Sequence, residues 1–320
     1  MNPFEELIAE TLGNEMPRSQ SFDLSNSGSS LSQQKTQISS VSSVIEYNPA
    51  RMANFLGYNT FNNKPAQKLE TIYENLSSSS IQNVPLNFHL NSPKQQETTD
   101  KKNLSMHGSV SSWRVPTGKH LYLRCISSSG KKVVRAFTPT STADQVGKFD
   151  LIVKLYRASG NWSGGKMSAC IDRLKPGDTV ECKGPFGDFE YQTGGTLVIK
   201  NIAHQVSRFT MIAGGSGITG IYPILRSAHK DGIKCHVVDC NKTEVDILMR
   251  QELDGYKEVS HCLSRPTNGW KGRSGYISKA LIGPVHDGFL LCCGPTGMME
   301  SVLKIAEIVG WDIKKQVIFL

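Results

Sequence analysis

The sequence predicts two folded domains behind an N-terminal tail: an antiparallel β-barrel, followed by an α/β domain with a parallel sheet. Three observations predict this arrangement. The first 65 residues are polar, apolar residues then recur at every second position, and from about residue 206 strand-like and helix-like segments alternate. A chain of 320 residues has room for two domains of ordinary size.

The tail comprises residues 1–65. Ser, Gln, Thr and Asn dominate residues 17–45, and such a composition buries too little apolar surface to offset the chain entropy that folding removes. We therefore expect the tail to be disordered or to act as a linker. Residues 50–58 could instead form a helical turn or contact a partner.

The barrel domain is expected at residues 66–205. Apolar residues alternate with polar ones in three stretches: Val84 to Leu90, Leu121 to Cys125, and Leu151 to Leu155. Gly, Pro and Ser interrupt these short strands, as is typical of antiparallel barrels. Residues 91–112 are long and polar, and we interpret them as an insertion loop between two barrel strands.

The α/β domain is expected at residues 206–320. The order of its elements, strand, glycine turn, helix, strand and helix, is typical of a parallel sheet with crossover helices. The expected strands are 209–213, 234–239, 258–263, 288–292 and 316–320, and the expected helices are 221–229, 244–253 and 297–309.

A glycine-rich turn follows the first strand of this domain. Gly215, Gly217 and Gly220 match the pattern GxGxxG, and Asp239 ends the next strand. Glycine lets backbone amides approach a pyrophosphate closely, and a helix N-terminus favours the anion. The turn therefore predicts dinucleotide binding, with a plain tight turn as the alternative.

Five motifs occur in one order along the chain. They are Arg135-Ala136-Phe137-Thr138-Pro139-Thr140-Ser141, Gly164-Gly165-Lys166-Met167-Ser168, Gly184-Pro185-Phe186-Gly187, Gly214-Gly215-Ser216-Gly217-Ile218-Thr219 and Cys293-Gly294-Pro295. Together they resemble the ferredoxin-NADP reductase superfamily, and more narrowly NADH-cytochrome b5 reductase and the flavin-binding part of assimilatory nitrate reductase. The resemblance implies an FAD-binding barrel followed by an NAD(P)H-binding domain.

The resemblance also implies which residues bind FAD. Arg135 would hold the pyrophosphate, as a guanidinium fork suits phosphate oxygens. Phe137 stands where the family has Tyr, so it would lie against the flavin without a phenolic hydrogen bond. The other implied FAD residues are Thr138 and Ser141 after this strand, Val153, Lys154 and Tyr156 beside the isoalloxazine ring, and Gly165, Lys166, Met167 and Ser168 at the phosphates.

A second group of residues is implied at the NADH site. These are Gly214, Gly215, Ser216 and Gly217 at the pyrophosphate, Thr219 near the flavin, and Cys293, Gly294 and Pro295 at the nicotinamide. Thr138 and Cys293 would be the catalytic residues, and the cysteine would position the ring rather than attack it. Inert packing is the alternative for a cysteine, and it fits Cys292. Gly220 replaces the proline usual in this family.

Two acids compete for the ribose 2′-hydroxyl. A carboxylate accepts a hydrogen bond from that hydroxyl and repels a 2′-phosphate. The generic dinucleotide pattern selects Asp239, whereas the resemblance selects Asp246. Both favour NADH, while Lys242 is a nearby cation that keeps NADPH open.

Charge and composition limit the function classes. Residues 1–65 hold four Lys and Arg against six Asp and Glu, which leaves 32 against 22, a net charge of +10, for the remainder. The basic residues form no tight cluster, so an acidic protein partner is favoured over nucleic acid. Eight scattered cysteines without zinc-type spacing predict no metal site, and we expect a cytoplasmic protein without a membrane span.

The resulting functional expectation is an FAD-dependent oxidoreductase. It would move a hydride from NADH to FAD and pass single electrons to an acidic haem protein of the cytochrome b5 type. One alternative is the reductase portion of a nitrate reductase-like system. The other is a non-catalytic nucleotide-binding or scaffold protein.

Overall fold

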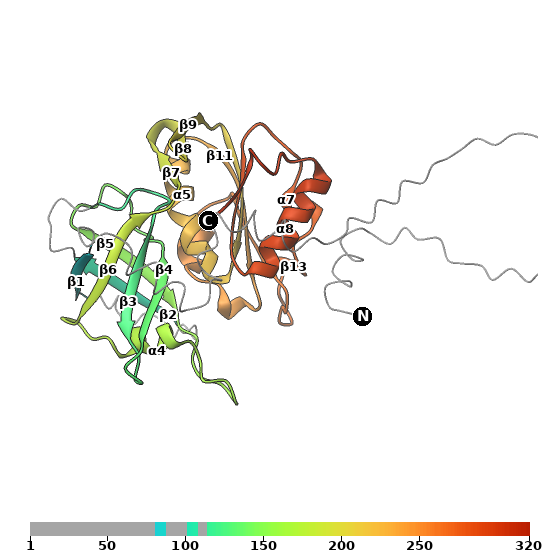
Figure 1. Cartoon of the computed structure of the whole chain (residues 1–320). Coiled ribbons are helices and arrows are strands. Elements are labelled where there is room, and N and C mark those ends of the chain that lie inside the picture. The colour runs from blue at the N-terminus through green and yellow to red at the C-terminus, as the bar shows by residue number, and fades with distance from the viewer. Residues whose placement is uncertain (1–80, 88–100, 108–113) are drawn as a thin grey trace, which may run out of the picture. The chain divides into compact units, whose positions relative to one another are not determined.

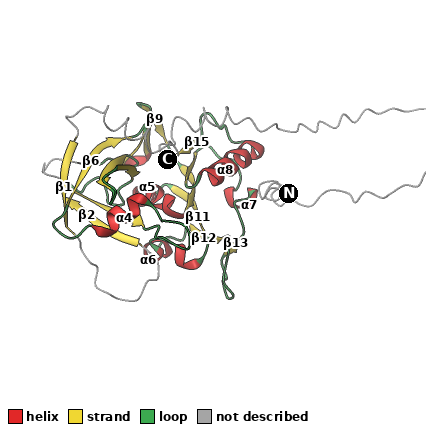
Figure 2. Cartoon of the chain, turned by 60° about the horizontal axis from the view of Figure 1, so that its bottom comes forward, coloured by secondary structure: helices red, strands yellow, loops and turns green. Residues whose placement is uncertain are grey.

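A computed structural model describes residues 81–87, 101–107 and 114–320 (Figure 1). These residues all belong to one compact unit, Phe55–Leu320. The expectation of a disordered tail at residues 1–65 lies outside the described residues. The two folded domains predicted from the sequence are both present, and their secondary structure is distinguished in Figure 2.

The first domain is built on a six-stranded sheet. In chain order its strands are β1 (Ile81–Asn87), β2 (Lys101–His107), β3 (His120–Ile126), β4 (Lys132–Phe137), β5 (Lys148–Lys154) and β6 (Thr179–Phe186). Their order in the sheet is β4-β3-β6-β1-β2-β5, and every pairing is antiparallel, as predicted. The helix α4 (Lys166–Arg173) packs near β3 and β4.

Hydrogen bonds connect the two edge strands of this sheet. The chain leaves β4 and runs to β5, where the N–H of Thr140 donates to the carbonyl of Asp150 at 2.9 Å. The N–H of Asp150 in turn donates to Oγ of Ser141 at 3.1 Å. These bonds close the sheet toward a barrel at the end of the segment Arg135–Ser141.

One prediction for this domain was wrong. The segment expected as an insertion loop, residues 91–112, contains the strand β2, which pairs with β5 along its whole length. Leu104 and Met106 are buried in the core at 1% and 0% exposure. The polar residues between and before them hid this short alternation in the sequence.

One of the polar residues in β2, Lys102, holds the end of α4. Its Nζ donates to the carbonyl oxygens of Ile171, Asp172 and Leu174, at 2.9, 3.1 and 2.7 Å. A lysine at the C-terminal end of a helix satisfies carbonyls that lack helical partners and meets the negative end of the helix dipole. Lys102 therefore fixes α4 to the sheet.

A small antiparallel sheet follows, formed by β7 (Phe189–Gln192), β8 (Thr196–Ile199) and β9 (Ile202–Gln205). The buried side chains of Phe189, Tyr191 and Leu197 belong to the same hydrophobic core as Phe209 and Met211 of the α/β domain. By packing, these strands accompany the second domain. The boundary between residues 205 and 206 remains a prediction.

The second domain contains a six-stranded parallel sheet. Its strands are β10 (Arg208–Gly214), β11 (Lys234–Asn241), β12 (Val259–Leu263), β13 (Arg273–Ser274), β14 (Phe289–Cys293) and β15 (Val317–Phe319), in the order β13-β12-β11-β10-β14-β15. The chain moves from β10 to β11 in one direction and from β14 to β15 in the other. With right-handed crossovers, α5 (Ile218–Lys230) and α8 (Thr296–Val309) therefore cover opposite faces (Figure 1).

The helix predicted at residues 244–253 is broken in the structure. A single 3₁₀ turn, Glu244–Asp246, precedes the helix α6 (Arg250–Asp254). Leu248 between them is fully buried, and Met249 adopts a left-handed backbone with φ of 58°. Burial of this apolar segment overrides the helical pattern. The sequence also gave no expectation of β13 or of the short helix α7 (Lys279–Ile282).

Candidate functional site

The strand order of the parallel sheet reverses between β10 and β14. Ligands of such sheets bind at the carboxyl ends of the strands beside this reversal. The glycine turn follows β10 and the cysteine turn follows β14, and Ala213 pairs in register with Cys293. The two motifs predicted to bind NADH therefore lie side by side.

Glycine is required where these two turns touch. A methyl group on Gly217 would collide with the carbonyl group of Cys293, and one on Gly214 would lie 2.6 Å from Sδ of Met298. Gly294 approaches Met298 and Gly214 with similar closeness, and Pro295 follows as an exposed residue. The backbone of one turn thus rests directly on the other.

The glycine turn itself is open to a ligand. Gly215 has a φ of +53°, with nothing close to its missing side chain, and Ser216 is exposed. No side chain caps the start of α5, and Oγ1 of Thr219 donates to the carbonyl of Ser216 at 2.9 Å. The backbone amides of this turn fit a pyrophosphate, because an anion would satisfy donors that the chain leaves uncapped.

The two predicted catalytic residues converge on Gly220. A Cβ at Gly220 would lie 3.2 Å from Sγ of Cys293 and 3.9 Å from Oγ1 of Thr138. Thr138 follows β4 of the first domain, whereas Cys293 ends β14 of the second. A hydroxyl and a thiol from different domains therefore border one small space.

Burial controls the chemistry of Cys293. Its Sγ donates to the carbonyl oxygen of Leu320 at 3.5 Å, and burial raises the pKa of the thiol to about 12. The group is therefore a neutral thiol at physiological pH. A neutral thiol is a poor nucleophile, which agrees with a positioning role.

The end of β5 and the start of α4 are joined by hydrogen bonds. The N–H of Gly165 donates to the carbonyl of Tyr156 at 2.8 Å, and the N–H of Tyr156 donates to Oγ of Ser168 at 3.0 Å. Gly165 precedes α4 without a side-chain cap, and Lys166 in the first turn is exposed. These uncapped amides and this lysine suit the phosphates of FAD.

Arg135 and Phe137 lie on the adjoining strand β4. Phe137 packs against the core of the first domain and stays partly exposed, as a residue that also contacts a flat ring would. The guanidinium of Arg135 donates through Nη1 to the carbonyl of Val134 at 2.7 Å, which leaves its other nitrogens for phosphate oxygens.

Three of the residues predicted to bind FAD have side chains that are engaged within the first domain itself. The side chains of Val153 and Met167 are 5% and 6% exposed within the hydrophobic core of the first domain, so neither side chain faces a ligand. Oγ of Ser141 accepts the N–H of Asp150, as described above. For Val153 and Met167 only the backbone remains for cofactor contact. The motifs that match the family include core positions as well as ligand positions, and the sequence match does not separate the two.

Asp239 is enclosed inside the second domain and has no exposed surface. One carboxylate oxygen accepts a hydrogen bond from Nδ2 of Asn241 at 2.8 Å and lies 3.0 Å from Nδ1 of His261. Burial raises the pKa of Asp239, opposed by these two partners. The carboxylate of Asp239 serves an internal network and offers no exposed atom to a ribose, so the generic expectation for this acid finds no support in the structure.

Asp246 lies at the end of the 3₁₀ turn and is partly exposed. Its Oδ2 accepts the N–H and the hydroxyl of Thr243, at 3.1 and 2.7 Å. Its Oδ1 accepts a hydrogen bond of 2.7 Å from Nζ of Lys154, which belongs to the first domain. Of the two acids, only Asp246 is placed where a ligand could approach it.

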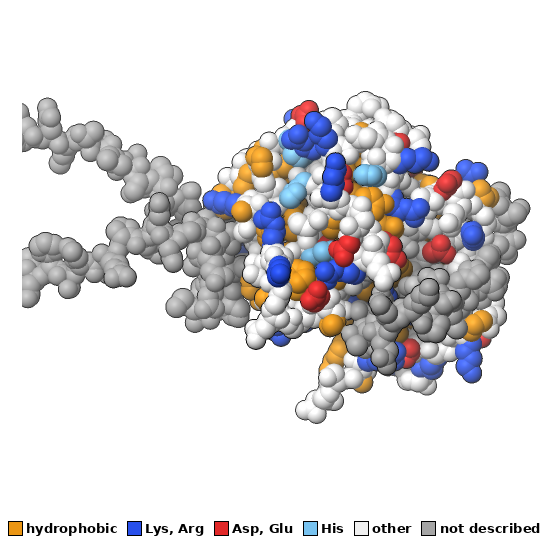
Figure 3. All heavy atoms as spheres, turned by 180° about the vertical axis from the view of Figure 1, so that it is seen from behind, with side chains coloured by type: hydrophobic (Ala, Val, Ile, Leu, Met, Phe, Trp, Pro, Cys, Tyr) orange, Lys and Arg blue, Asp and Glu red, His pale blue; other side chains and the backbone are white. Residues whose placement is uncertain are grey.

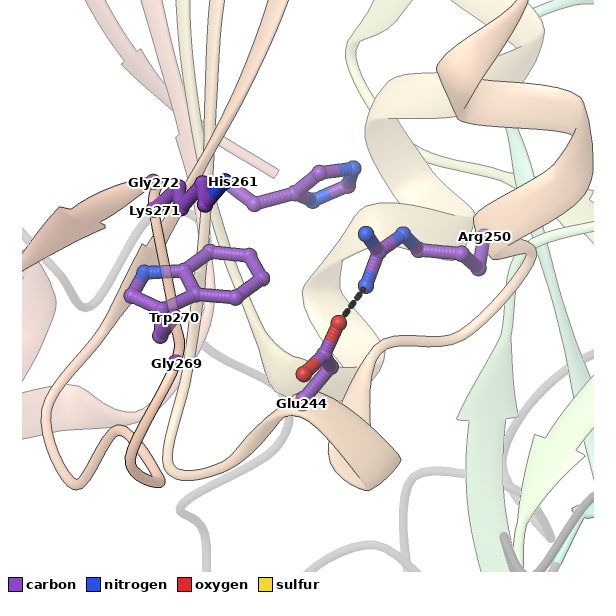
Figure 4. A pocket seen from close by; sticks show the side chains of 7 residues that line it. All are labelled: Glu244, Arg250, His261, Gly269, Trp270, Lys271 and Gly272. Atoms are coloured by element: carbon purple, nitrogen blue, oxygen red, sulfur yellow. Dashed lines mark hydrogen bonds and ion pairs between the residues drawn. The ribbon is translucent and has the colours of Figure 1, made fainter.

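A pocket of about 360 Å³ in the second domain was not anticipated (Figure 4). Its lining residues are Glu244, Arg250, His261, Gly269, Trp270, Lys271 and Gly272. The guanidinium of Arg250 lies 5.5 Å from the ring centre of Trp270 and pairs with Glu244 at 2.9 Å. The sequence feature that could have indicated this pocket is Trp270 in the segment Gly269-Trp270-Lys271-Gly272. Only the fold brings Arg250 to this tryptophan.

The surface charge is mixed. In Figure 3, Lys and Arg side chains are spread over the visible face with Asp and Glu between them. Among the described residues, no helix combines the length and apolar character needed to cross a membrane. Within that same part of the chain, no group of three or more His, Cys, Asp and Glu side chains is arranged to hold a metal ion.

Two protein families match the chain. The oxidoreductase FAD-binding domain family matches residues 92–191, and the oxidoreductase NAD-binding domain family matches residues 211–304. These matches confirm the predicted pair of cofactors, FAD and a nicotinamide dinucleotide, and the predicted order of their domains.

Curated relatives include nitrate reductases. A nitrate reductase (NADPH) of Emericella nidulans is 38% identical over 217 residues, which are 62% of this chain and 25% of the relative. A nitrate reductase (NADH) of Solanum lycopersicum is 35% identical over 224 residues, which are 64% of this chain and 24% of the relative. The chain thus spans about a quarter of the length of these relatives.

Solved structures show the same fold. The cytochrome b5 reductase domain of Ulva prolifera nitrate reductase matches with a TM-score of 0.66 and 28% identity, over 75% of this chain and 97% of that one. The CS-b5R domains of human Ncb5or match with a TM-score of 0.60 and 22% identity, over 75% and 69% of the two chains.

Proposed function

This chain belongs to the ferredoxin-NADP reductase superfamily, in the branch of the cytochrome b5 and nitrate reductases, and from that membership we propose that it moves a hydride from NADH to FAD and then passes single electrons to a haem protein. The observation that carries the proposal is the convergence of Thr138 and Cys293 at Gly220, one from each domain. A flavin and a nicotinamide held by separate domains must meet at such a junction.

The residues of this chain would bind and orient the reactants. Bound FAD supplies the conversion of a two-electron donor into a one-electron donor. Arg135, Gly165 and Lys166 hold its phosphates, and Phe137 borders the ring. The amides of Gly215 to Gly217 hold the dinucleotide pyrophosphate. The thiol of Cys293 and the hydroxyl of Thr138 restrict the nicotinamide to a reactive orientation.

We propose NADH as the preferred donor, with NADPH as the second candidate. Asp246 supports NADH, because a carboxylate accepts a hydrogen bond from a 2′-hydroxyl and repels a 2′-phosphate. NADPH is supported by the names of several relatives and by exposed Lys242 in the same loop.

The proposed acceptor is an acidic haem protein of the cytochrome b5 type in the cytoplasm. The net charge of +10 outside residues 1–65 supports an acidic partner. The nitrate reductase relatives favour a second candidate, in which this chain forms the reductase portion of a nitrate reductase-like system.

An anaerobic spectral titration tests the proposal. The purified protein with FAD is mixed with one equivalent of NADH, and ferricyanide follows. We expect NADH to bleach the visible flavin band and ferricyanide to restore it. Bleaching by NADPH alone would reverse the donor preference. A protein that retains no FAD would contradict the proposal and favour a non-catalytic nucleotide-binding protein.

A further inference from the structure

Lys154 and Asp246 connect the two domains by an ion pair. Nζ of Lys154 lies 2.7 Å from Oδ1 of Asp246, although 92 positions separate them in the sequence. Their side chains are 17% and 27% exposed. Water screens such a partly buried pair less than a fully exposed one, so each charge changes the field at the other.

Strand β5 presents Lys154 to the second domain. Residues two apart on a strand share a face, and Ile152, two residues earlier, packs against the hydrophobic core of the second domain. Lys154 ends the strand at the rim of that contact. The lysine is thus directed at the second domain by packing in its own strand.

Asp246 is held independently of the lysine. Thr243 and Asp246 form a reciprocal capping box, in which Oδ2 accepts both the N–H and the hydroxyl of Thr243. The carboxylate therefore keeps its place if Lys154 is removed, and what it loses is the neutralising charge. Burial raises the pKa of Asp246, but the hydrogen bonds from Lys154 and Thr243 outweigh burial and lower it overall.

We propose that Lys154, on the flavin domain, is a specificity-determining residue for the dinucleotide that acts through Asp246: it cancels part of the carboxylate charge that would otherwise exclude a 2′-phosphate. The inference rests on the proposed function, in which Asp246 borders the 2′ position. The choice between NADH and NADPH is then shared by the two domains. Lys154 is a positioning residue in this role.

The test compares four proteins: wild type, Lys154→Met, Asp246→Asn and the double variant. For each, calorimetry gives the ratio of the Kd values for NADP⁺ and NAD⁺, and kinetics gives the corresponding kcat/KM ratio for NADPH and NADH. Lys154→Met should disfavour the 2′-phosphate by a further severalfold to about tenfold. Asp246→Asn should shift both ratios the opposite way by a similar factor.

The double variant separates an indirect effect from a direct one. If Lys154 acts through Asp246, adding Lys154→Met to the Asp246→Asn background should leave both ratios unchanged. If the lysine contacts the phosphate itself, the same loss of NADP⁺ binding will appear in that background, and the inference fails. Lys148→Met, on the exposed start of the same strand, is the matched control and should keep the wild-type ratios.

FAD content and thermal stability are measured for every variant. Should Lys154→Met fail to retain FAD, Lys154→Gln replaces it in the same cycle. If wild type neither binds nor is reduced by either dinucleotide, the proposed function fails. If wild type uses a dinucleotide but Lys154→Met leaves its ratios unchanged, only the role of Lys154 is refuted.

Discussion

Cys293 illustrates how its surroundings limit what a reactive side chain can do. Burial raises the pKa of its thiol, which lies close to Gly220 and donates to the carbonyl oxygen of Leu320. Neither of these neighbours would activate it as a nucleophile. These surroundings support the proposal that Cys293 positions the nicotinamide ring.

We expect Cys293→Ser to slow flavin reduction by NADH about tenfold or more while FAD stays bound. Serine is smaller and would let the nicotinamide shift, and small displacements of reacting atoms cost large factors in rate. Stopped-flow reduction under anaerobic conditions measures the effect, with Cys292→Ser as a control for general packing damage. A wild-type reduction rate would show that the cysteine is structural.

At this scale the sequence predicted motif positions better than side-chain directions. The sequence pattern placed the Gly214 and Cys293 turns at the ends of strands in a parallel sheet, but the strand order that makes these two turns neighbours came only from the structure. Val153 and Met167 were assigned to the ligand because they stand inside matching motifs, yet their side chains face the core. The Lys154–Asp246 pair could not be predicted, because it depends on how two domains meet.

His261 connects separate elements of the second domain. It lies in the middle of β12, contacts Asp239 of β11 through Nδ1 at 3.0 Å, and contacts Asp254 of α6 through Nε2 at 3.1 Å. Burial lowers the pKa of His261, but the two carboxylates outweigh burial and raise it above its ordinary value. His261 thus links two strands and a short helix, and protonation of its ring strengthens both contacts.

His261→Gln should remove a pH-dependent part of the stability. A raised histidine pKa contributes stability that is fully present below the unfolded value of about 6.5 and is lost as pH rises through the folded value. The variant should therefore lose more at pH 6 than at pH 8, about 1–3 kcal/mol at the lower pH. Thermal denaturation of both proteins at the two pH values measures it, and an equal loss at both would contradict the charged bridge.

Elements were predictable where their pattern was long and regular. The strands β10, β11 and β14 and the helices α5 and α8 lie within a few residues of their predicted positions. Strand β2 was missed because two buried residues among polar ones make a weak alternation. The prediction of one continuous helix after β11 was wrong because the helix is interrupted where Leu248 enters the core. This interruption depends on contacts with residues that are distant in the sequence.

The molecule as a whole carries a positive charge that its two cofactors do not fully explain. The net charge outside residues 1–65 is +10, and on the face shown in Figure 3 the acids lie between the bases. A distributed field of this kind attracts an acidic protein over some distance and leaves the details of docking to local contacts. It also attracts anions in general.

We expect electron transfer to an acidic haem protein to weaken as salt is added. At 0.15 M ionic strength charges are screened beyond about 8 Å, so steering is lost while short contacts persist. The rate of cytochrome b5 reduction should fall severalfold between about 0.02 and 0.3 M salt, whereas reduction of a neutral quinone should change little. Equal salt dependence for the two acceptors would argue against an acidic partner.

The small sheet of β7, β8 and β9 constrains how such reductases can be recombined. Its strands follow the flavin-binding region in sequence, but their side chains complete the core around Phe209 and Met211. A nucleotide-binding domain transferred into another reductase would have to include this sheet. Without it, part of the hydrophobic core of that domain would be exposed. Packing therefore groups the strands from about residue 189 onward with the parallel sheet, whereas the predicted boundary lies between residues 205 and 206.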